Sequence, residues 1–133
     1  MTDFGILFCR LFFGLMMLSA HGWPKLSMDP TMFPDPLGIS VMLSYWLVVF
    51  AEVICSGAVA IGLFSRLASI PVIITMLVAS FVVHAEDPFS KKEFALLYAA
   101  GFIIVFLTGS GKYSVQEVLG LSSHKKLFRF FLK

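Results

Sequence analysis

Charged side chains are scarce in this sequence. They make up 14% of its 133 residues, whereas hydrophobic residues make up 59%. Soluble globular domains typically carry about 25% charged residues, and the mean hydropathy of this chain is +0.93. The composition therefore excludes an ordinary soluble enzyme and predicts a single membrane domain, with little chain left for a domain outside the bilayer.

Cysteine and histidine are also few, with two and three residues respectively. Cys9 and Cys55 lie in apolar segments and form no Cys-x-x-Cys pattern, so we expect buried, inert thiols rather than a redox pair. The histidines show no short-range ligand spacing such as His-x-x-x-His. The sequence therefore predicts no metal site, and the weak candidates for one are His21, His84 and Glu93.

Signals for nucleotide and nucleic-acid binding are missing as well. The formal net charge is only +2, and the basic residues gather near the C-terminus, which favours contact with anionic lipid. The lone Gly109-Ser-Gly111 follows no strand and does not predict a phosphate-binding loop. We expect no nucleic-acid partner and no covalently bound cofactor.

Long apolar runs dominate what is present. Four of them predict transmembrane helices over about 4–22, 41–64, 67–84 and 93–109, because a helix needs about 20 apolar residues to cross a bilayer. The connection between the first two contains four prolines and reads as a loop. The predicted fold class is an all-α membrane protein, a four-transmembrane-helix bundle over residues 1–111 followed by a cytoplasmic tail over 112–133.

The distribution of lysine and arginine predicts the orientation. If both termini are cytoplasmic, six basic residues beyond the spans lie inside and three lie outside, as the positive-inside rule favours. The six are Arg66, Lys112, Lys125, Lys126, Arg129 and Lys133. We therefore expect an N-in, C-in, multi-pass membrane protein.

The last ten residues predict an amphipathic helix that lies on the bilayer surface. On a helical projection Lys125, Lys126, Arg129 and Lys133 fall within an arc of about 100°, and leucine and phenylalanine fill the remainder. We expect these basic residues to anchor the tail to the inner leaflet. A docking surface for a partner protein is the alternative.

Glu52 is the only charged residue between positions 41 and 64, and it falls near the middle of that span. A carboxylate at such depth costs about 2.5 kcal/mol or more, so it should face protein and have a partner. Tyr45 and Ser56 share its helical face. We therefore predict an intramembrane polar site built on Glu52.

The first span carries a face of polar and small residues. Helical periodicity brings to one side Asp3, Arg10, Gly14, Met17 and His21. We expect this side to face the other helices. Arg10 is then placed either to pair with Glu52 or to snorkel to the inner interface, and the sequence leaves both open.

Several polar residues should meet at the outer ends of the helices and line a vestibule that leads to Glu52. A quinone head needs hydrogen-bond partners, an apolar slot and a proton donor, and such a vestibule offers them. The catalytic candidates are Glu52, His84 and His21, and the candidates for binding a substrate or quinone are Arg10, Tyr45, Glu52 and Lys25. The alternative is that Arg10 and Glu52 only fix helix register as a buried ion pair.

These residues, in this order, resemble a known family. The motifs are Arg10-Leu-Phe-Phe-Gly14, His21-Gly22 with Lys25, Glu52 with Gly57, Gly62-Leu-Phe-Ser-Arg66, His84, and Gly109-Ser-Gly-Lys-Tyr113-Ser114. Together they resemble the DoxX family of small four-helix bacterial membrane proteins, over roughly residues 6–115. The positions that match the family's motif are Arg10, His21, Lys25, Glu52, Arg66, His84 and Tyr113, whereas Gln116 stands where the family often has an aspartate.

The resemblance implies a multi-pass protein of the bacterial cytoplasmic (inner) membrane, and it implies two kinds of role. The family takes its name from a subunit of a thiosulfate:quinone oxidoreductase, and related members resemble membrane partners of soluble oxidative-stress enzymes or assembly factors. We expect an accessory subunit that supports a membrane-associated redox or sulfur-stress complex and has a redox partner protein. The alternatives are a quinone-reducing subunit acting on thiosulfate or a similar sulfur compound, and a small-molecule or proton permease, for which a homo-oligomer is one route to a pathway.

Overall fold

The computed structural model describes residues 1–121 and residue 130. All regular elements in this part of the chain are helical, as the sequence predicts. The amphipathic helix expected at the C-terminus, with Lys125, Lys126, Arg129 and Lys133, lies outside the described residues and stays a prediction.

The first span is one continuous helix over residues 3–25. It consists of α1 (Asp3–Met17), a π-helical turn η1 (Leu18–Gly22) and α2 (Trp23–Lys25). The Thr2 hydroxyl accepts a hydrogen bond from the Gly5 amide at 3.2 Å and caps the start. The helix runs three residues beyond the predicted end at 22. Pro24 does not end it, because this proline stands in the first turn of α2, where proline is tolerated.

The second and third spans are joined by a tight turn. The second consists of α3 (Val41–Val49), the π-helical turn η3 (Phe50–Cys55) and α4 (Ser56–Ile61), and the third of α5 (Ser65–Val78) and the π-helical turn η4 (Ala79–Val83). The second span was predicted to reach residue 64, but it ends at Ile61 because Gly62 adopts a left-handed conformation with φ +78°.

The last long helix is α6 (Phe89–Thr108), which the short helix α7 (Val115–Val118) follows. Within the described residues, three stretches are long and apolar enough to cross a membrane: Asp3–Lys25, Val41–Ile61 and Ser65–Val83. Helix α6 is less apolar because Lys91, Lys92 and Glu93 lie near its start. Its crossing of the bilayer, and the orientation of the chain, stay predictions.

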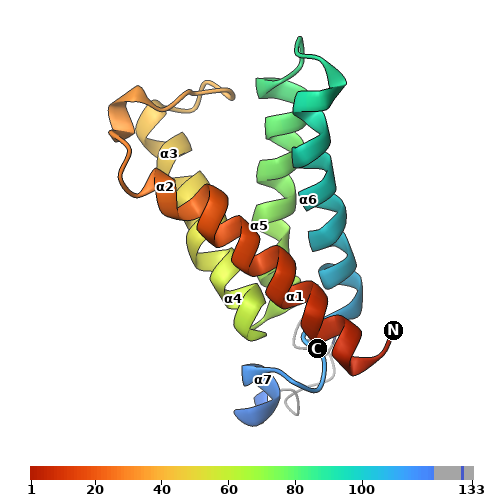
Figure 1. Cartoon of the computed structure of the whole chain (residues 1–133). Helices are drawn as coiled ribbons and strands as arrows, with labels where there is room; N and C mark the ends of the chain where they lie inside the picture. Colours follow the sequence, from red (N-terminus) through yellow and green to blue (C-terminus); the bar gives the residue numbers. More distant parts are fainter. Residues whose placement is uncertain (122–129, 131–133) are drawn as a thin grey trace.

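The helices pack as a bundle (Figure 1). Helix α5 packs along α6, while α1 contacts α4 and α6, and α4 contacts α5. Met17, Val59, Val72, Phe102 and Val105 are fully shielded from solvent between them. The connections at residues 26–40 and 84–88 lie at one end, here named the loop end. The N-terminus, the turn at 62–64 and helix α7 lie at the other, named the turn end.

Small residues allow α1 to approach its neighbours closely. A side chain at Gly14 would come within 2.9 Å of Ala60, so α1 and α4 meet with backbone near backbone. Arg10, Gly14 and Met17 are buried, which confirms most of the inward face predicted for the first span. Asp3 is exposed and His21 is half-buried.

Candidate functional site

Glu52 forms an ion pair with Lys25 at the base of the loop end. The Lys25 Nζ donates a hydrogen bond to Glu52 Oε2 at 2.5 Å and another to the His21 carbonyl at 3.3 Å. The Glu52 side chain is 4% exposed and that of Lys25 is 19% exposed. A buried carboxylate is thus met by a cation on the neighbouring helix, as its burial requires.

The backbone around Glu52 explains why the pair forms. Glu52 lies in the π-helical turn η3, and the Ser56 hydroxyl donates a hydrogen bond to the Glu52 carbonyl. Gly22 packs directly against that carbonyl, with no room for a side chain. This contact holds the two spans together one turn from Lys25, and the Tyr45 hydroxyl donates to the Lys25 carbonyl at 2.9 Å.

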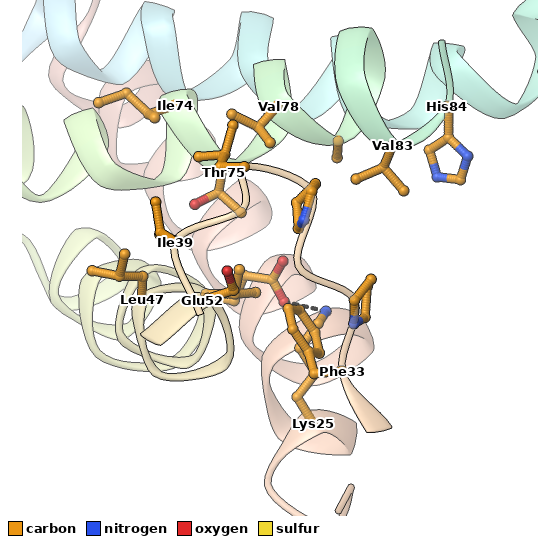
Figure 2. A pocket seen from close by; sticks show the side chains of 16 residues that line it. Lys25, Phe33, Ile39, Leu47, Glu52, Ile74, Thr75, Val78, Val83 and His84 are labelled. Carbon is orange, nitrogen blue, oxygen red and sulfur yellow. Dashed lines mark hydrogen bonds and ion pairs between the residues drawn. The ribbon is translucent and has the colours of Figure 1, made fainter. Parts of the chain in front are cut away.

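A pocket of about 330 Å³ opens above this pair. Its walls come from α3, α5 and the 33–39 segment of the first loop, and Figure 2 shows Glu52 and Lys25 meeting at one side with Thr75 on the opposite wall. The lining is mostly apolar. Its polar side chains belong to Lys25, Ser44, Glu52, Thr75 and His84.

His84 stands at the far side of the pocket, away from the charged pair (Figure 2). Its Nδ1 lies 2.7 Å from Asp87 Oδ2, and Asp87 also lies 3.7 Å from Lys91 Nζ. The hydrogen bond from His84 is the main reason that the pKa of Asp87 is lowered. Because Asp87 holds Nδ1, the His84 Nε2 is left as the ring nitrogen that can serve a ligand.

Asp35 organises the loop over the pocket. Its carboxylate accepts hydrogen bonds from the Ile39 amide at 3.1 Å, the Ser40 amide at 2.9 Å and the Ser44 hydroxyl at 2.7 Å. The bond from Ser44 is the main reason that the pKa of Asp35 is lowered. The 33–39 segment, which supplies five lining residues, is thereby tied to the start of α3.

The structure brings together some of the residues predicted from the sequence. Lys25, Glu52 and His84 line the pocket, and Tyr45 supports it through Lys25. His21 instead packs on the ring of Tyr98, with ring centroids 5.1 Å apart. Glu93 is not among the lining residues. Within the described residues, no three histidine, cysteine or acidic side chains gather as a metal site would need.

Arg10 lies apart from this site and has a different set of partners. It is 1% exposed and donates to the Val59, Ala60 and Tyr113 carbonyls at 3.4, 3.2 and 2.5 Å. Neither the predicted pair with Glu52 nor the snorkelling is found. The carbonyls at the end of α4 carry partial negative charge, which suits them to a guanidinium, and the Val59 carbonyl also accepts from the Gly62 amide at 3.1 Å.

A polar cluster at the turn end was not predicted. The Gln116 side-chain oxygen accepts from the Phe64 amide at 3.0 Å and from the Ser110 hydroxyl at 3.0 Å. Ser110 Oγ in turn accepts from the Ser65 amide at 3.3 Å and lies 3.0 Å from the Ser65 hydroxyl. Gln116 is 1% exposed. The capping pair Ser114 and Glu117 was the available sequence signal for this helix, and the Glu117 amide does donate to Ser114 Oγ.

Fold and site together define a small helical membrane protein whose helices enclose a mostly apolar pocket with a charged pair at its base. The DoxX family model matches residues 5–85, more than half of the chain, and the chain belongs to the DoxX family. This matched region contains Lys25, Glu52 and His84. Comparisons with curated proteins and with solved structures gave no match.

Proposed function

We propose that the protein is an accessory membrane subunit of a redox or sulfur-stress complex, and that its pocket holds the head of a quinone. The observation that carries the proposal is the single charged pair, Lys25 with Glu52, at the base of an otherwise mostly apolar pocket. Apolar walls with a few convergent polar groups are typical of sites for small organic ligands.

The polar groups suit the two sides of a quinone head. Lys25 donates hydrogen bonds and can meet a carbonyl oxygen, while Glu52 is a proton-carrying group beside it. His84 lies across the pocket, with Asp87 fixing the orientation of its ring. In this role the chain binds and positions the quinone, and the electrons come from a partner protein.

Enzymatic reduction of the quinone by this chain is the second candidate. Here two thiosulfate ions give up one electron each and join through a new S–S bond as tetrathionate, and the quinone takes up these two electrons and two protons to become the quinol. Glu52 and His84 both line the pocket and are side chains that can pass protons to a bound quinone, which is the specific observation in favour. Thiosulfate-dependent quinone reduction by the purified protein in lipid nanodiscs separates this candidate from the accessory role.

A permease is less well supported. The pocket stops at the level of Glu52, and the turn end is filled by the buried side chains of Arg10 and Gln116. A pathway within one chain requires these groups to move apart. Labelled-solute uptake into proteoliposomes, if found, would restore this candidate.

Binding of a quinone without a tail, measured by calorimetry on the protein in nanodiscs, tests the proposal. Replacing Glu52→Gln removes the charge that pairs with Lys25, and we expect the affinity to fall by roughly tenfold or more, since hydrogen bonds to charged groups contribute about 1.5–3 kcal/mol. Glu93→Gln is the matched control, because it removes a carboxylate that does not line the pocket. Equal binding by both variants would refute the site.

A further inference from the structure

A second, separate hollow lies along the seam between the second and third spans, on the turn-end side of the pocket. It has a volume of about 350 Å³. Its walls include Phe50, Ile54 and Ala58 on one side and Leu67, Ile70 and Pro71 on the other. No charged residue lines it, and its most polar group is the thiol of Cys55. It is therefore fitted to an apolar occupant.

The two hollows follow the same helix faces. Leu47 lines the first hollow and Ile54 the second, while on α5 the corresponding residues are Ile74 and Ile70. Ile70 and Ile74 lie four residues apart within α5, a step that keeps side chains on one face of an α-helix. Leu47, Ile54 and Ile74 are 50%, 60% and 56% exposed, so this face looks away from the bundle, toward the bilayer.

We propose that this seam is the groove for the ligand's tail, and that the ligand enters the pocket sideways from the bilayer. The head lies at Lys25 and Glu52, and one long apolar tail leaves between Leu47 and Ile74 and lies along Ile54. The inference rests on the proposed quinone site and adds the class of ligand: a neutral head with a single long tail.

The charges of the pocket favour this ligand over a phospholipid. The charge of Lys25 is already balanced by Glu52 at 2.5 Å, so no free cation awaits a phosphate. The groove is a single seam between two spans, which suits one tail rather than two. The seam has room for a long tail. On α5, the lining of the two hollows extends from Val78 in the pocket to Leu67 in the second hollow, 11 residues or about 16 Å along the helix axis.

The position of the bound tail tests the groove more sensitively than the affinity of the tailed quinone does. A groove of apolar side chains is about as apolar as the lipid it replaces, so the tail gains packing but little hydrophobic free energy. The probe is a quinone with a photoreactive diazirine near the end of a long tail, added to the full-length protein in phospholipid nanodiscs. We expect the label mainly on residues 50–58 and 63–71.

Two variants of equal chemistry test the groove. Ile54→Trp fills it, and we expect the loss of most labelling in both segments while a quinone without a tail still binds. Ile103→Trp makes the same change on the exposed face of α6, and we expect labelling to stay at the wild-type level. An excess of the tailless quinone should compete the label away, because both heads use one site.

The possible failures are distinguishable. If the tailless quinone binds through Glu52 but the tail label spreads evenly over all lipid-facing helices, the groove is refuted and the quinone pocket stands. If the label falls on the seam but neither the competitor nor Glu52→Gln reduces it, the seam holds only bulk lipid and the inference is overturned. If neither quinone binds, the inference falls together with the proposed function.

Discussion

Among the described residues, the two buried charged side chains, Arg10 and Glu52, are stabilised in separate places. Glu52 has the Lys25 ammonium and Arg10 has backbone carbonyls. Arg10 and Lys25 are 15 residues apart on one continuous helix, which is about 22 Å along its axis. The sequence correctly indicates that both charges face protein. The sequence does not show whether the Arg10 guanidinium binds a carboxylate or three backbone carbonyls, because this depends on where the fold places the end of α4.

Gly62 is the residue on which the Arg10 contacts depend most directly. It adopts φ +78°, and a side chain there would collide with the Arg10 guanidinium. We expect Gly62→Ala to destabilise the protein by about 2–3 kcal/mol, from the left-handed backbone and the displaced hydrogen bonds. The free energy of unfolding, followed by helicity during denaturation in mixed micelles, measures this loss.

Gly57→Ala provides the matched control for Gly62→Ala. Gly57 lies inside α4, and no atom lies within 4 Å of where its side chain would be. Alanine is a better helix former than glycine by about 1 kcal/mol, so this change should leave stability unchanged or raise it. Equal losses in the two variants would contradict the role assigned to Gly62.

At the scale of the elements, hydropathy predicts the first three spans well, with errors of a few residues at their ends. The π-helical turns η1, η3 and η4 are not predictable in this way, because they arise from packing between spans and leave hydropathy unchanged. The same holds for the site. Glu52 was identifiable as a lone charge in an apolar run, whereas Asp35 and Thr75 had no signal, since the fold alone brings them to the pocket.

The loop over the pocket should respond to acid through Asp35. Its hydrogen bonds, chiefly from Ser44, lower its pKa in the folded protein. The stability that Asp35 contributes is therefore present above its unfolded pKa of about 3.9 and is lost as pH falls through the lower folded value. We expect the protection of residues 36–44 against amide exchange, measured by mass spectrometry relative to the intrinsic exchange rate at each pH, to fall in that acidic range.

Asp35→Asn should remove this dependence on pH and speed exchange at neutral pH as well. Asp29→Asn is the control, because within the described part of the chain the Asp29 carboxylate accepts only from Thr31, at 3.0 Å from the amide and 2.8 Å from the hydroxyl. It should affect the short 3₁₀ turn η2 (Pro30–Met32) and leave residues 36–44 protected. Loss of protection there in both variants would show that the loop responds to charge in general rather than to Asp35.

For the whole molecule, the two ends of the bundle differ in kind. The loop end contains the pocket, while the turn end is packed with buried polar side chains that bond to backbone groups. The cluster joins the segment after α6 to the turn after α4, since the Gln116 amide donates to the Gly62 carbonyl at 3.2 Å. Residues 62 and 116 therefore lie at the same end of the bundle, the turn end. Helix α6 must then extend across the same thickness of the bundle as α5.

This geometry predicts a fourth crossing by α6 in spite of its charges. The uncharged run 94–108 is about 22 Å long, and Lys91 and Lys92 lie at its outer end, where long side chains can reach the headgroups. Single cysteines at Asp29, Glu86 and Lys112, all exposed, test this with a maleimide that does not cross membranes. In intact cells we expect labelling of Asp29→Cys and Glu86→Cys, and labelling of Lys112→Cys only after permeabilisation.

The unmodified protein is the blank for this experiment, because Cys55 is buried and Cys9 is half-buried. Labelling of Lys112→Cys together with Glu86→Cys in intact cells would mean that α6 does not cross. The reverse pattern, with only Lys112→Cys labelled, would mean that the termini face outward. In that case the pocket opens toward the cytoplasm, and a cytoplasmic partner protein would reach the side of His84 and Asp87 rather than the polar cluster at the turn end.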